Sequence, residues 1–554
     1  MDNFSVEEID FVEIIPIVKK YEWGKKEENA LTKVFYRNLH EIKLLELNHF
    51  SSTLSRENGN TSNSSEFGSK EITETKKKET FSVDKKIGLL EANQQEDHEQ
   101  PYAELWYGSH ISSPSKVSFN GNILENMTLD DIISSIFSRK NSSFVSEYNQ
   151  KNQNPNSLDL TINPTSVTTY TGKSTHHNKI PFLLKILSIS KPLSLQVHPD
   201  KTLAKELHSS FPSIYSDDNH KPEIAIALSE FETLCGFKDT LEILSLLEGF
   251  PEILPIFGIS LEFIFETINS YNGDKLPSTD QNQDPLFTIK KELFINMLNS
   301  KPETINDALS RLVARLTKNK SHLSSNSNTN TTTVASIESL ILRLHYHFPL
   351  DIGIISPLLL NYYKLNPGDA IFIGAGTIHS YISGECLECM ANSDNVIRCG
   401  LTPKLKDIPN LIKAVNFQSN NSKLILNHIA FSSLPILGGR DLPFIIDYFV
   451  DSIKEYHVQI LSLDFQSSNS IAFSTPTTSP YSLLLCLSGN CTISFGKERT
   501  NNHSLSKVFQ GKAIFVNFNT EIYFHPLSYD EKSSESKDDV KFALVTLPPP
   551  LSSL

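Results

Sequence analysis

Polar side chains that can bind a metal lie close together between residues 194 and 223, beside strand-like sequence. In an extended segment alternate side chains point to one face, so Ser194, Gln196 and His198 would share a face. Pro222 disfavours a helix at the residue before it, and alternation would place Glu223 on the face opposite its apolar neighbours. Imidazole, amide and carboxylate groups in this pattern predict a metal site, with His220 close by.

A further imidazole, that of His379, lies in the glycine-rich segment GAGTIHSYI before an apolar strand. Gln196, His198, Glu223 and His379 together offer two nitrogen and two oxygen donors. Two histidines and a carboxylate with an open position are a recurrent catalytic zinc arrangement, although iron or manganese accept the same donors. The alternative for each histidine is a hydrogen-bonded structural role.

Basic residues near these donors suit a phosphorylated substrate. Arg398 and Lys404 end the segment GECLECMANSDNVIRCGLTPK, and arginine binds phosphate through its planar fork whereas lysine acts as a compact charge. Lys185 in FLLKIL and Lys221 before Pro222 add positive charge, which is unusual inside apolar strand sequence. Surface or internal ion pairs are the alternative for each of them.

The composition narrows the class of protein. A chain of 554 residues is too long for one core, and a prior of roughly 100 to 200 residues per domain predicts several domains. The net charge of −14 argues against a general affinity for nucleic acid or anionic membranes. No apolar run reaches about 18 residues and the acidic start lacks the basic region of a secretory signal, so we expect a cytoplasmic protein.

Six cysteines are too few for a disulfide scaffold, which fits a reducing compartment. Cys386 and Cys389 form a C-x-x-C, but in extended sequence they would face opposite ways. No second pair stands at zinc-ribbon spacing, so we expect no structural zinc there.

Four polar segments cannot bury a core, and we expect them to be surface loops, partly or wholly disordered. They lie at about 51–99, 142–179 and 321–333 and in DEKSSESKDD, which starts at Asp530.

Between about 238 and 348 the apolar residues recur at helical spacing, as at Leu309, Leu312, Val313 and Leu316. On both sides of this block, short extended runs are divided by Gly, Pro and Asn; YSLLLCLSGNCTISFG predicts a hairpin that turns near Gly489. The pattern therefore predicts one β-barrel or sandwich interrupted by helices, followed by a second β-domain.

Several long motifs resemble one family, the type I mannose-6-phosphate isomerases (phosphomannose isomerases). The motifs follow the family's order and cover most of the chain outside the polar segments and the C-terminal region. They are YEWGK, PYAELWYGSH, PLSLQVHPDK, NHKPEIAIAL, LCGF and GTIHSYISGECLECMANSDNVIRCGLTPK.

The resemblance implies a mainly β fold: a cupin-type (jelly-roll) catalytic barrel, an inserted helical domain and a second cupin-like domain. The expected domains are 1–237 and 351–420 for the catalytic barrel, 238–350 for the helices and 421–554 for the C-terminal domain. The resemblance also implies one zinc ion per chain, a sugar-phosphate substrate, no nucleic-acid or membrane partner, and a monomer.

Site residues follow by motif. The implied metal ligands are Gln196, His198, Glu223 and His379. The implied substrate-binding residues are Trp23, Glu104, Lys185, Ser194, Arg398 and Lys404, and the implied catalytic residues are Glu388, Lys221, His220, Asp394 and Arg398.

The implied reaction is the reversible conversion of mannose 6-phosphate to fructose 6-phosphate through an enediolate, which feeds mannose into GDP-mannose and glycan synthesis. A base must remove the proton at C2. The sequence leaves Glu388 and Lys221 both open as this base, and we expect His220 with Asp394 to assist ring opening.

Two other classes compete with this reading. An iron-dependent cupin-type dioxygenase would use the same His and carboxylate donors, but it would give Arg398 and Lys404 no evident task. A sugar-phosphate sensor without catalysis is the second alternative, because fold does not fix function.

Overall fold

The computed structural model describes the chain in separate stretches. These are residues 11–39, 100–119, 122–134, 180–271, 284–323, 333–418, 425–426, 429–431, 444–465, 471–474, 479, 481–495, 506–517, 520–527 and 539–548. Most of the four polar segments expected as loops lies outside the described residues. One expectation is corrected: a helix extends to Leu323, into the segment expected to be a loop from Ser321, because no Gly or Pro interrupts residues 317–323.

The chain divides into two compact units. Unit 1 contains residues 1–21, 26–186 and 428–554, and unit 2 contains residues 22–25 and 187–427. This division differs from the expected domain boundaries, which stay a prediction.

Unit 1 is built from two stacked antiparallel sheets. The nine-stranded sheet runs in the order β15 (Ile429–Phe431), β16 (Phe444–Tyr448), β17 (His457–Leu463), β24 (Val540–Thr546), β19 (Tyr481–Ser488), β22 (Ala513–Asn517), β1 (Phe11–Ile15), β4 (Lys116–Phe119) and β5 (Asn122–Thr128). The four-stranded sheet runs in the order β18 (Ile471–Ser474), β23 (Glu521–His525), β20 (Asn490–Phe495) and β21 (Ser506–Phe509). The N-terminal strand β1 therefore lies between the C-terminal strand β22 and the pair β4 and β5, and joins the two parts of this sheet. Unit 1 also contains β2 (Ile17–Lys19), β3 (Glu104–Gly108) and the first part of β6 (Phe182–Ile189).

The two sheets of unit 1 share one apolar core. Leu484 and Cys486 of β19 belong to the same buried cluster as Cys491 and Ile493 of β20. The hairpin expected at Gly489 is therefore wrong, since β19 and β20 belong to different sheets. Gly489 has φ +75°, and a Cβ there would come within 3.0 Å of the Val540 backbone; the glycine lets the chain turn from one sheet to the other.

Unit 2 holds strands that meet around β12 (His379–Ala391). On one side the order is β14 (Ile425–Leu426), β11 (Ala370–Ile373), β8 (Glu223–Ala227) and β12. β12 also pairs with β9 (Phe231–Phe237) and with β7 (Leu195–Val197), while β9 pairs with β10 (Leu360–Leu365) and β7 with β13 (Ile397–Gly400). A tight turn joins β10 to β11, where the Asp369 N–H donates to the carbonyl oxygen of Asn366 at 2.9 Å.

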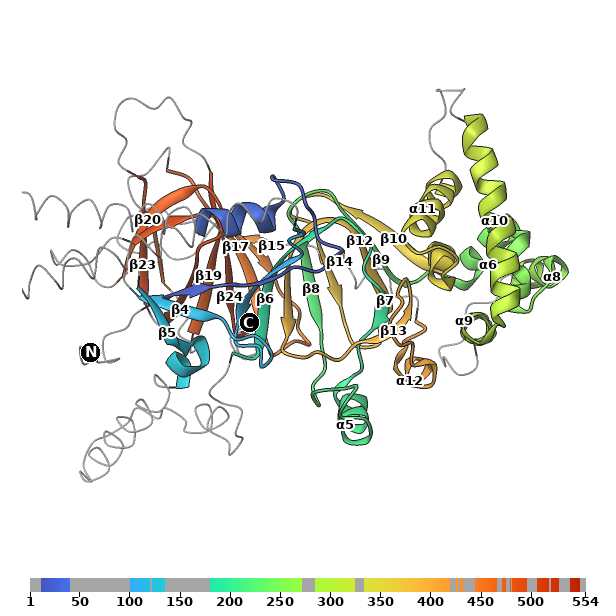
Figure 1. Cartoon of the computed structure of the whole chain (residues 1–554), viewed down its shortest axis with the longest axis horizontal. Coiled ribbons are helices and arrows are strands. Elements are labelled where there is room, and N and C mark those ends of the chain that lie inside the picture. Colours follow the sequence, from blue (N-terminus) through green and yellow to red (C-terminus); the bar gives the residue numbers. More distant parts are fainter. Residues whose placement is uncertain are drawn as a thin grey trace, which may run out of the picture. The chain divides into compact units, whose positions relative to one another are not determined.

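Helices gather beyond β9 and β10 in unit 2 (Figure 1). They are α6 (Thr240–Glu248), η2 (Pro251–Ile253), α7 (Leu254–Phe257), α8 (Leu261–Tyr271), α9 (Pro285–Asn299), α10 (Pro302–Leu323), α11 (Thr333–His347) and the 3₁₀ helix η4 (Ile352–Leu358). Two more helices, α5 (Lys201–Ser210) and α12 (Ile408–Ala414), lie outside this group. The helical spacing read from the sequence is confirmed: Leu309, Leu312 and Leu316 are buried on one side of α10.

The helical group and several strands of unit 2, β7 and β13 among them, share a single core, the helix–strand core. It contains Leu309 of α10 and Ile341 of α11 together with Leu195 and Val197 of β7. Because side chains alternate along a strand, Gln196 between them points to the other face. Strand β13 repeats the pattern, with Ile397 and Cys399 in the same core, so Arg398 points away from it.

No single helix among the described residues is long and apolar enough to cross a lipid bilayer. The pair Pro251–Phe257 and Leu261–Tyr271 passes the same length and composition test together, with a bend of 85° between its members.

Candidate metal centre

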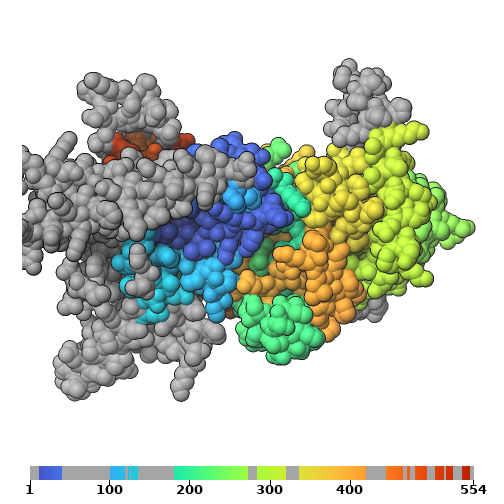
Figure 2. Space-filling model, in the orientation of Figure 1, coloured from blue at the N-terminus to red at the C-terminus, as the bar shows by residue number. Residues whose placement is uncertain are grey.

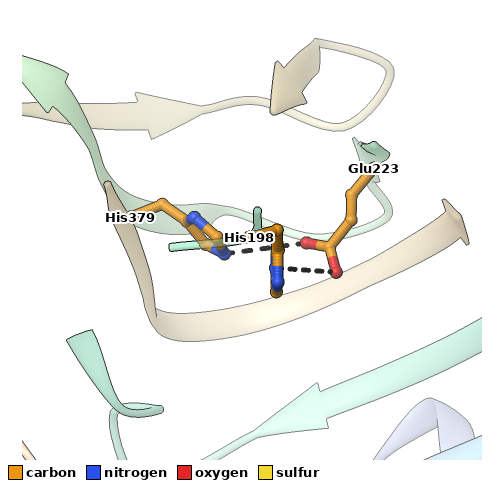
Figure 3. Close-up of side chains that lie close together, drawn as sticks. All are labelled: His198, Glu223 and His379. Atoms are coloured by element: carbon orange, nitrogen blue, oxygen red, sulfur yellow. Dashed lines mark ion pairs between the residues drawn. The ribbon is translucent and has the colours of Figure 1, made fainter. Parts of the chain in front are cut away.

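Three of the expected metal ligands come together in unit 2. Donor atoms of His198, Glu223 and His379 all lie within 4.8 Å of one another, and all three side chains are buried. Nε2 of His198 lies 3.3 Å from Oε1 of Glu223, and Nε2 of His379 lies 3.7 Å from Oε2. Figure 3 shows both rings beside the carboxylate. The residues come from the end of β7 and the first positions of β8 and β12, so strand pairing sets their spacing.

The tautomers of the two histidines fit a cation. Nδ1 of His198 lies 2.7 Å from the carbonyl oxygen of Asn395, and Nδ1 of His379 lies 2.9 Å from that of Thr377. Each Nδ1 must donate a proton to its carbonyl, so each neutral ring turns the lone pair of Nε2 toward Glu223. Nε2 of His198 is buried and makes no hydrogen bond. Two lone pairs facing a carboxylate repel one another unless a cation lies between them, and this donor set suits zinc.

Gln196 and Ser194 lie next to this cluster, as alternation predicts. Gln196 is opposite His379 in the β7–β12 pairing, and its Nε2 lies 3.3 Å from Nε2 of His379. Ser194 donates its hydroxyl to Oε1 of Gln196 at 2.9 Å. Their expected roles as ligand and substrate contact stay predictions.

Neighbouring groups keep Glu223 ionised. Burial raises the pKa of its carboxyl, but His198 and Lys221 outweigh this effect and hold the pKa well below its usual value. Lys221 is buried, with Nζ 3.3 Å from Oε1 of Glu223. The pKa of His379 is lowered to about 4 by burial and then by His198, so this imidazole remains neutral near pH 7.

These shifts predict acid sensitivity of the metal-free protein. An imidazole in the unfolded chain titrates near 6.5 and that of His379 near 4, so its contribution to stability is complete above pH 6.5 and is lost as the pH falls toward 4. Between pH 7 and pH 5 this one group should lower the free energy of unfolding by about 2 kcal/mol. The depressed pKa of Glu223 adds a loss in the same direction below its usual pKa.

Urea unfolding of metal-free protein at pH 7 and pH 5 measures this loss. The His379→Gln variant is the matched control, since its side chain does not titrate. An equal pH dependence in both proteins would contradict the prediction.

The expected substrate and catalytic residues of unit 2 take different positions. Glu388 is buried on β12 opposite Ala225 of β8, so it shares the sheet face of Glu223. Arg398 is half-buried opposite Gln196 in the β7–β13 pairing. Burial lowers the pKa of Arg398, an effect that Tyr215 opposes.

The remaining expected residues of unit 2 lie nearer the surface. His220 is half-buried two residues before Pro222, whereas Asp394 and Lys404 are exposed. Trp23 packs its partly buried side chain against a buried apolar cluster to which β8, β9, β11 and β12 contribute. Its carbonyl oxygen accepts the N–H groups of Ser190 and Lys191.

Glu104 and Lys185 belong to unit 1. Both are buried, and Nζ of Lys185 lies 3.6 Å from Oε2 of Glu104. The indole N–H of Trp106 donates to the same carboxylate oxygen. These contacts match the ion-pair alternative, so the assignment of both residues to the substrate pocket stays a prediction.

Sequence reasoning missed two residues of the site. The hydroxyl of Tyr381 lies 3.5 Å from Oε2 of Glu223, and its pKa is raised by burial and then by Glu388 and Glu223. Tyr381 follows His379 by two positions on β12, so strand alternation was a signal that could have found it. Asn395 accepts the Nδ1 proton of His198 with its backbone carbonyl oxygen. Because every residue has such a carbonyl, no sequence pattern predicts this contact.

A cavity of about 420 Å³ is lined by residues other than the expected site residues. Its lining residues include Asp200 and Glu206 of the α5 region and Lys413 and Asn416 of the α12 region. Figure 2 shows this part of the surface, where α5 in green lies beside the orange segment that carries α12. None of the lining residues is an expected ligand or substrate contact, so this cavity is not the predicted substrate pocket.

The mainly β architecture with inserted helices and the buried His–Glu–His cluster together define a metal-binding enzyme domain of cupin type. Two family models match the chain: "Phosphomannose isomerase type I, catalytic domain" over residues 142–240 and "Phosphomannose isomerase type I, helical insertion domain" over residues 266–360.

Curated relatives carry the same name. A "Probable mannose-6-phosphate isomerase" of Echinococcus multilocularis is 34% identical over 399 residues, which is 71% of this chain and 79% of the relative. "Mannose-6-phosphate isomerase 1" of Arabidopsis thaliana is 33% identical over 432 residues, 78% of this chain and 84% of the relative. The chain belongs to the type I phosphomannose isomerase family.

Solved structures agree on the fold. A point mutant of phosphomannose isomerase from Salmonella typhimurium has a TM-score of 0.60 at 22% identity, covering 97% of this chain and all of the other. A zinc-bound mannose 6-phosphate isomerase has a TM-score of 0.59 at 23% identity, over 97% of this chain and 100% of that one. The expected cupin-type fold with a helical domain is confirmed.

Proposed function

We propose that this chain catalyses the reversible isomerisation of mannose 6-phosphate and fructose 6-phosphate, the activity for which its relatives are named. The observation that carries the proposal is the buried cluster of His198, Glu223 and His379, with two imidazole lone pairs directed at an ionised carboxylate. In a member of this family, such a cluster provides the centre that the reaction needs.

The donor set fits zinc. We propose that His198, Glu223 and His379 hold one zinc ion, with Gln196 as the fourth protein ligand. When bound, zinc acts as a Lewis acid that lowers the energy of negative charge developing on a sugar oxygen.

The residues of the chain perform the remaining tasks. Isomerisation moves a proton between C2 and C1, and a buried carboxylate such as Glu388 can accept and return it. Lys221 is the other candidate base. His220 with Asp394 would assist opening of the sugar ring by giving and taking hydroxyl protons.

The phosphate group needs cationic partners. Arg398 points away from the helix–strand core and would bind phosphate oxygens through its planar guanidinium, with Lys404 as a second charge. We also propose that the protein works as a monomer in the cytoplasm. Its net charge of −14 supports the further proposal that it has no nucleic-acid or anionic-membrane partner.

A coupled assay tests the proposal directly. Purified protein is given mannose 6-phosphate, and fructose 6-phosphate is followed with and without a zinc chelator. We expect turnover that the chelator abolishes and added zinc restores. Turnover unaffected by complete metal removal would refute the metal-dependent mechanism. Oxygen consumption by iron-loaded protein without isomerisation would favour the dioxygenase class instead.

A further inference from the structure

One carboxylate, that of Asp217, ties the segment before β8 to the loop 392–396 that joins β12 to β13. Ser393 donates its hydroxyl to Oδ1 at 2.8 Å, and the backbone N–H of Asp394 donates to Oδ2 at 2.8 Å. The amide of Asn395 donates to Oδ1 at 3.1 Å and to the carbonyl oxygens of Asp217 and Asn219 at 2.8 and 2.9 Å. These contacts hold the loop at several points.

The loop passes the end of β7 at the position of a metal ligand. β12 and β13 both pair with β7, and Ile397 at the start of β13 lies opposite Val197. The antiparallel register therefore brings Asn395 next to His198, and the carbonyl oxygen of Asn395 accepts the Nδ1 proton of that ring. This carbonyl fixes both the tautomer and the orientation of the imidazole.

The side chain of Asn395 makes its hydrogen bonds as a donor, through Nδ2. It is buried, and its Oδ1 has no hydrogen-bond partner although its Nδ2 has three acceptors. A buried amide oxygen without a partner is costly. The three Nδ2 contacts hold the backbone of Asn395 in place, and with it the carbonyl oxygen that faces His198.

We propose that Asp217 and Asn395 are positioning residues of the metal centre: they hold the Asn395 carbonyl oxygen where it binds Nδ1 of His198 and so directs Nε2 of that ring at the cation. The inference rests on the proposed function, because it assumes that His198 binds the metal. Loss of a partner that orients a ligating histidine costs roughly 10-fold to 100-fold in metal affinity. We call the contacts of Asp217 with Ser393, Asp394 and Asn395 the Asp217 clamp. It also holds the backbone of Asp394, an expected catalytic residue.

The test measures the zinc dissociation constant of the whole chain by competition with a chromogenic chelator at 25 °C, with the melting temperature of the metal-free protein in parallel. Asn395→Ala and Asp217→Ala should each weaken zinc binding about 10-fold to 100-fold. Asp217→Asn keeps one acceptor oxygen and should fall between Asp217→Ala and the unaltered protein. If an alanine variant does not fold, Asp217→Asn and Ser393→Ala, each expected to bind zinc more weakly, carry the test.

Asp239→Ala is the matched control for a purely structural effect. Asp239 caps α6 by accepting the N–H of Leu241 at 3.0 Å, so its loss should lower the melting temperature and leave zinc affinity unchanged. Unchanged affinity in every folded clamp variant would overturn the inference, provided that His198→Ala loses zinc. If His198→Ala also keeps its affinity, the proposed metal site is itself wrong.

Discussion

Replacing His198 or His379 with alanine should release the zinc and lower kcat/KM about 1000-fold or more. Each substitution removes one of two nitrogen donors from a buried site, and a carboxylate with one imidazole makes an incomplete set. Several kcal/mol of transition-state stabilisation depend on the metal, and each 1.36 kcal/mol corresponds to a tenfold change in rate.

Elemental analysis of purified variants, together with the coupled assay, measures both effects. His208→Ala is the matched control, because His208 also places Nδ1 2.8 Å from a backbone carbonyl, that of Tyr215, but lies outside the cluster. This variant should keep its zinc and its activity. Full metal content and turnover in both His198→Ala and His379→Ala would contradict the assignment of the site.

The second large effect concerns the proton at C2. We expect Glu388→Gln to abolish exchange of that proton with solvent deuterium and to lower kcat at least about 100-fold, the usual range for loss of a general base. Lys221 is a poorer base here, since its Nζ lies 3.3 Å from Glu223 and an ammonium in an ion pair has no lone pair to accept a proton.

Lys221→Met is the comparison that separates the two residues. It should slow turnover by removing a positive charge beside Glu223, while product formed in deuterium oxide still carries solvent label. Mass spectrometry of the product reports the label. Exchange that survives in Glu388→Gln but disappears in Lys221→Met would make Lys221 the base.

Much of the site could be predicted because strand alternation is a local property. Ser194 and Gln196 lie together at the site, and His198 follows at the same spacing, as the period of two requires. The helices were predictable for the same reason, since Leu309 and Leu312 mark a buried face at helical spacing.

What failed depends on contacts between distant segments. Gly489 and Asn490 form a sequence typical of a hairpin turn. However, β19 and β20 pair with strands of two different sheets, so the chain turns from one sheet to the other at this point. The membership of β1 in a sheet with β22 and the clamp at Asp217 depend likewise on long-range pairing, which leaves no local pattern in the sequence.

The helix–strand core has a consequence for inherited or engineered variation. Leu195 and Val197 pack β7 against the helices, while Gln196 and His198 point to the candidate metal site. Substitution of a buried apolar residue of α10 or α11 would therefore weaken the packing that holds β7, and with it Gln196 and His198, in position. We expect such a variant to unfold at a lower temperature and to lose its zinc on mild warming, even when the substituted residue lies far from the metal site.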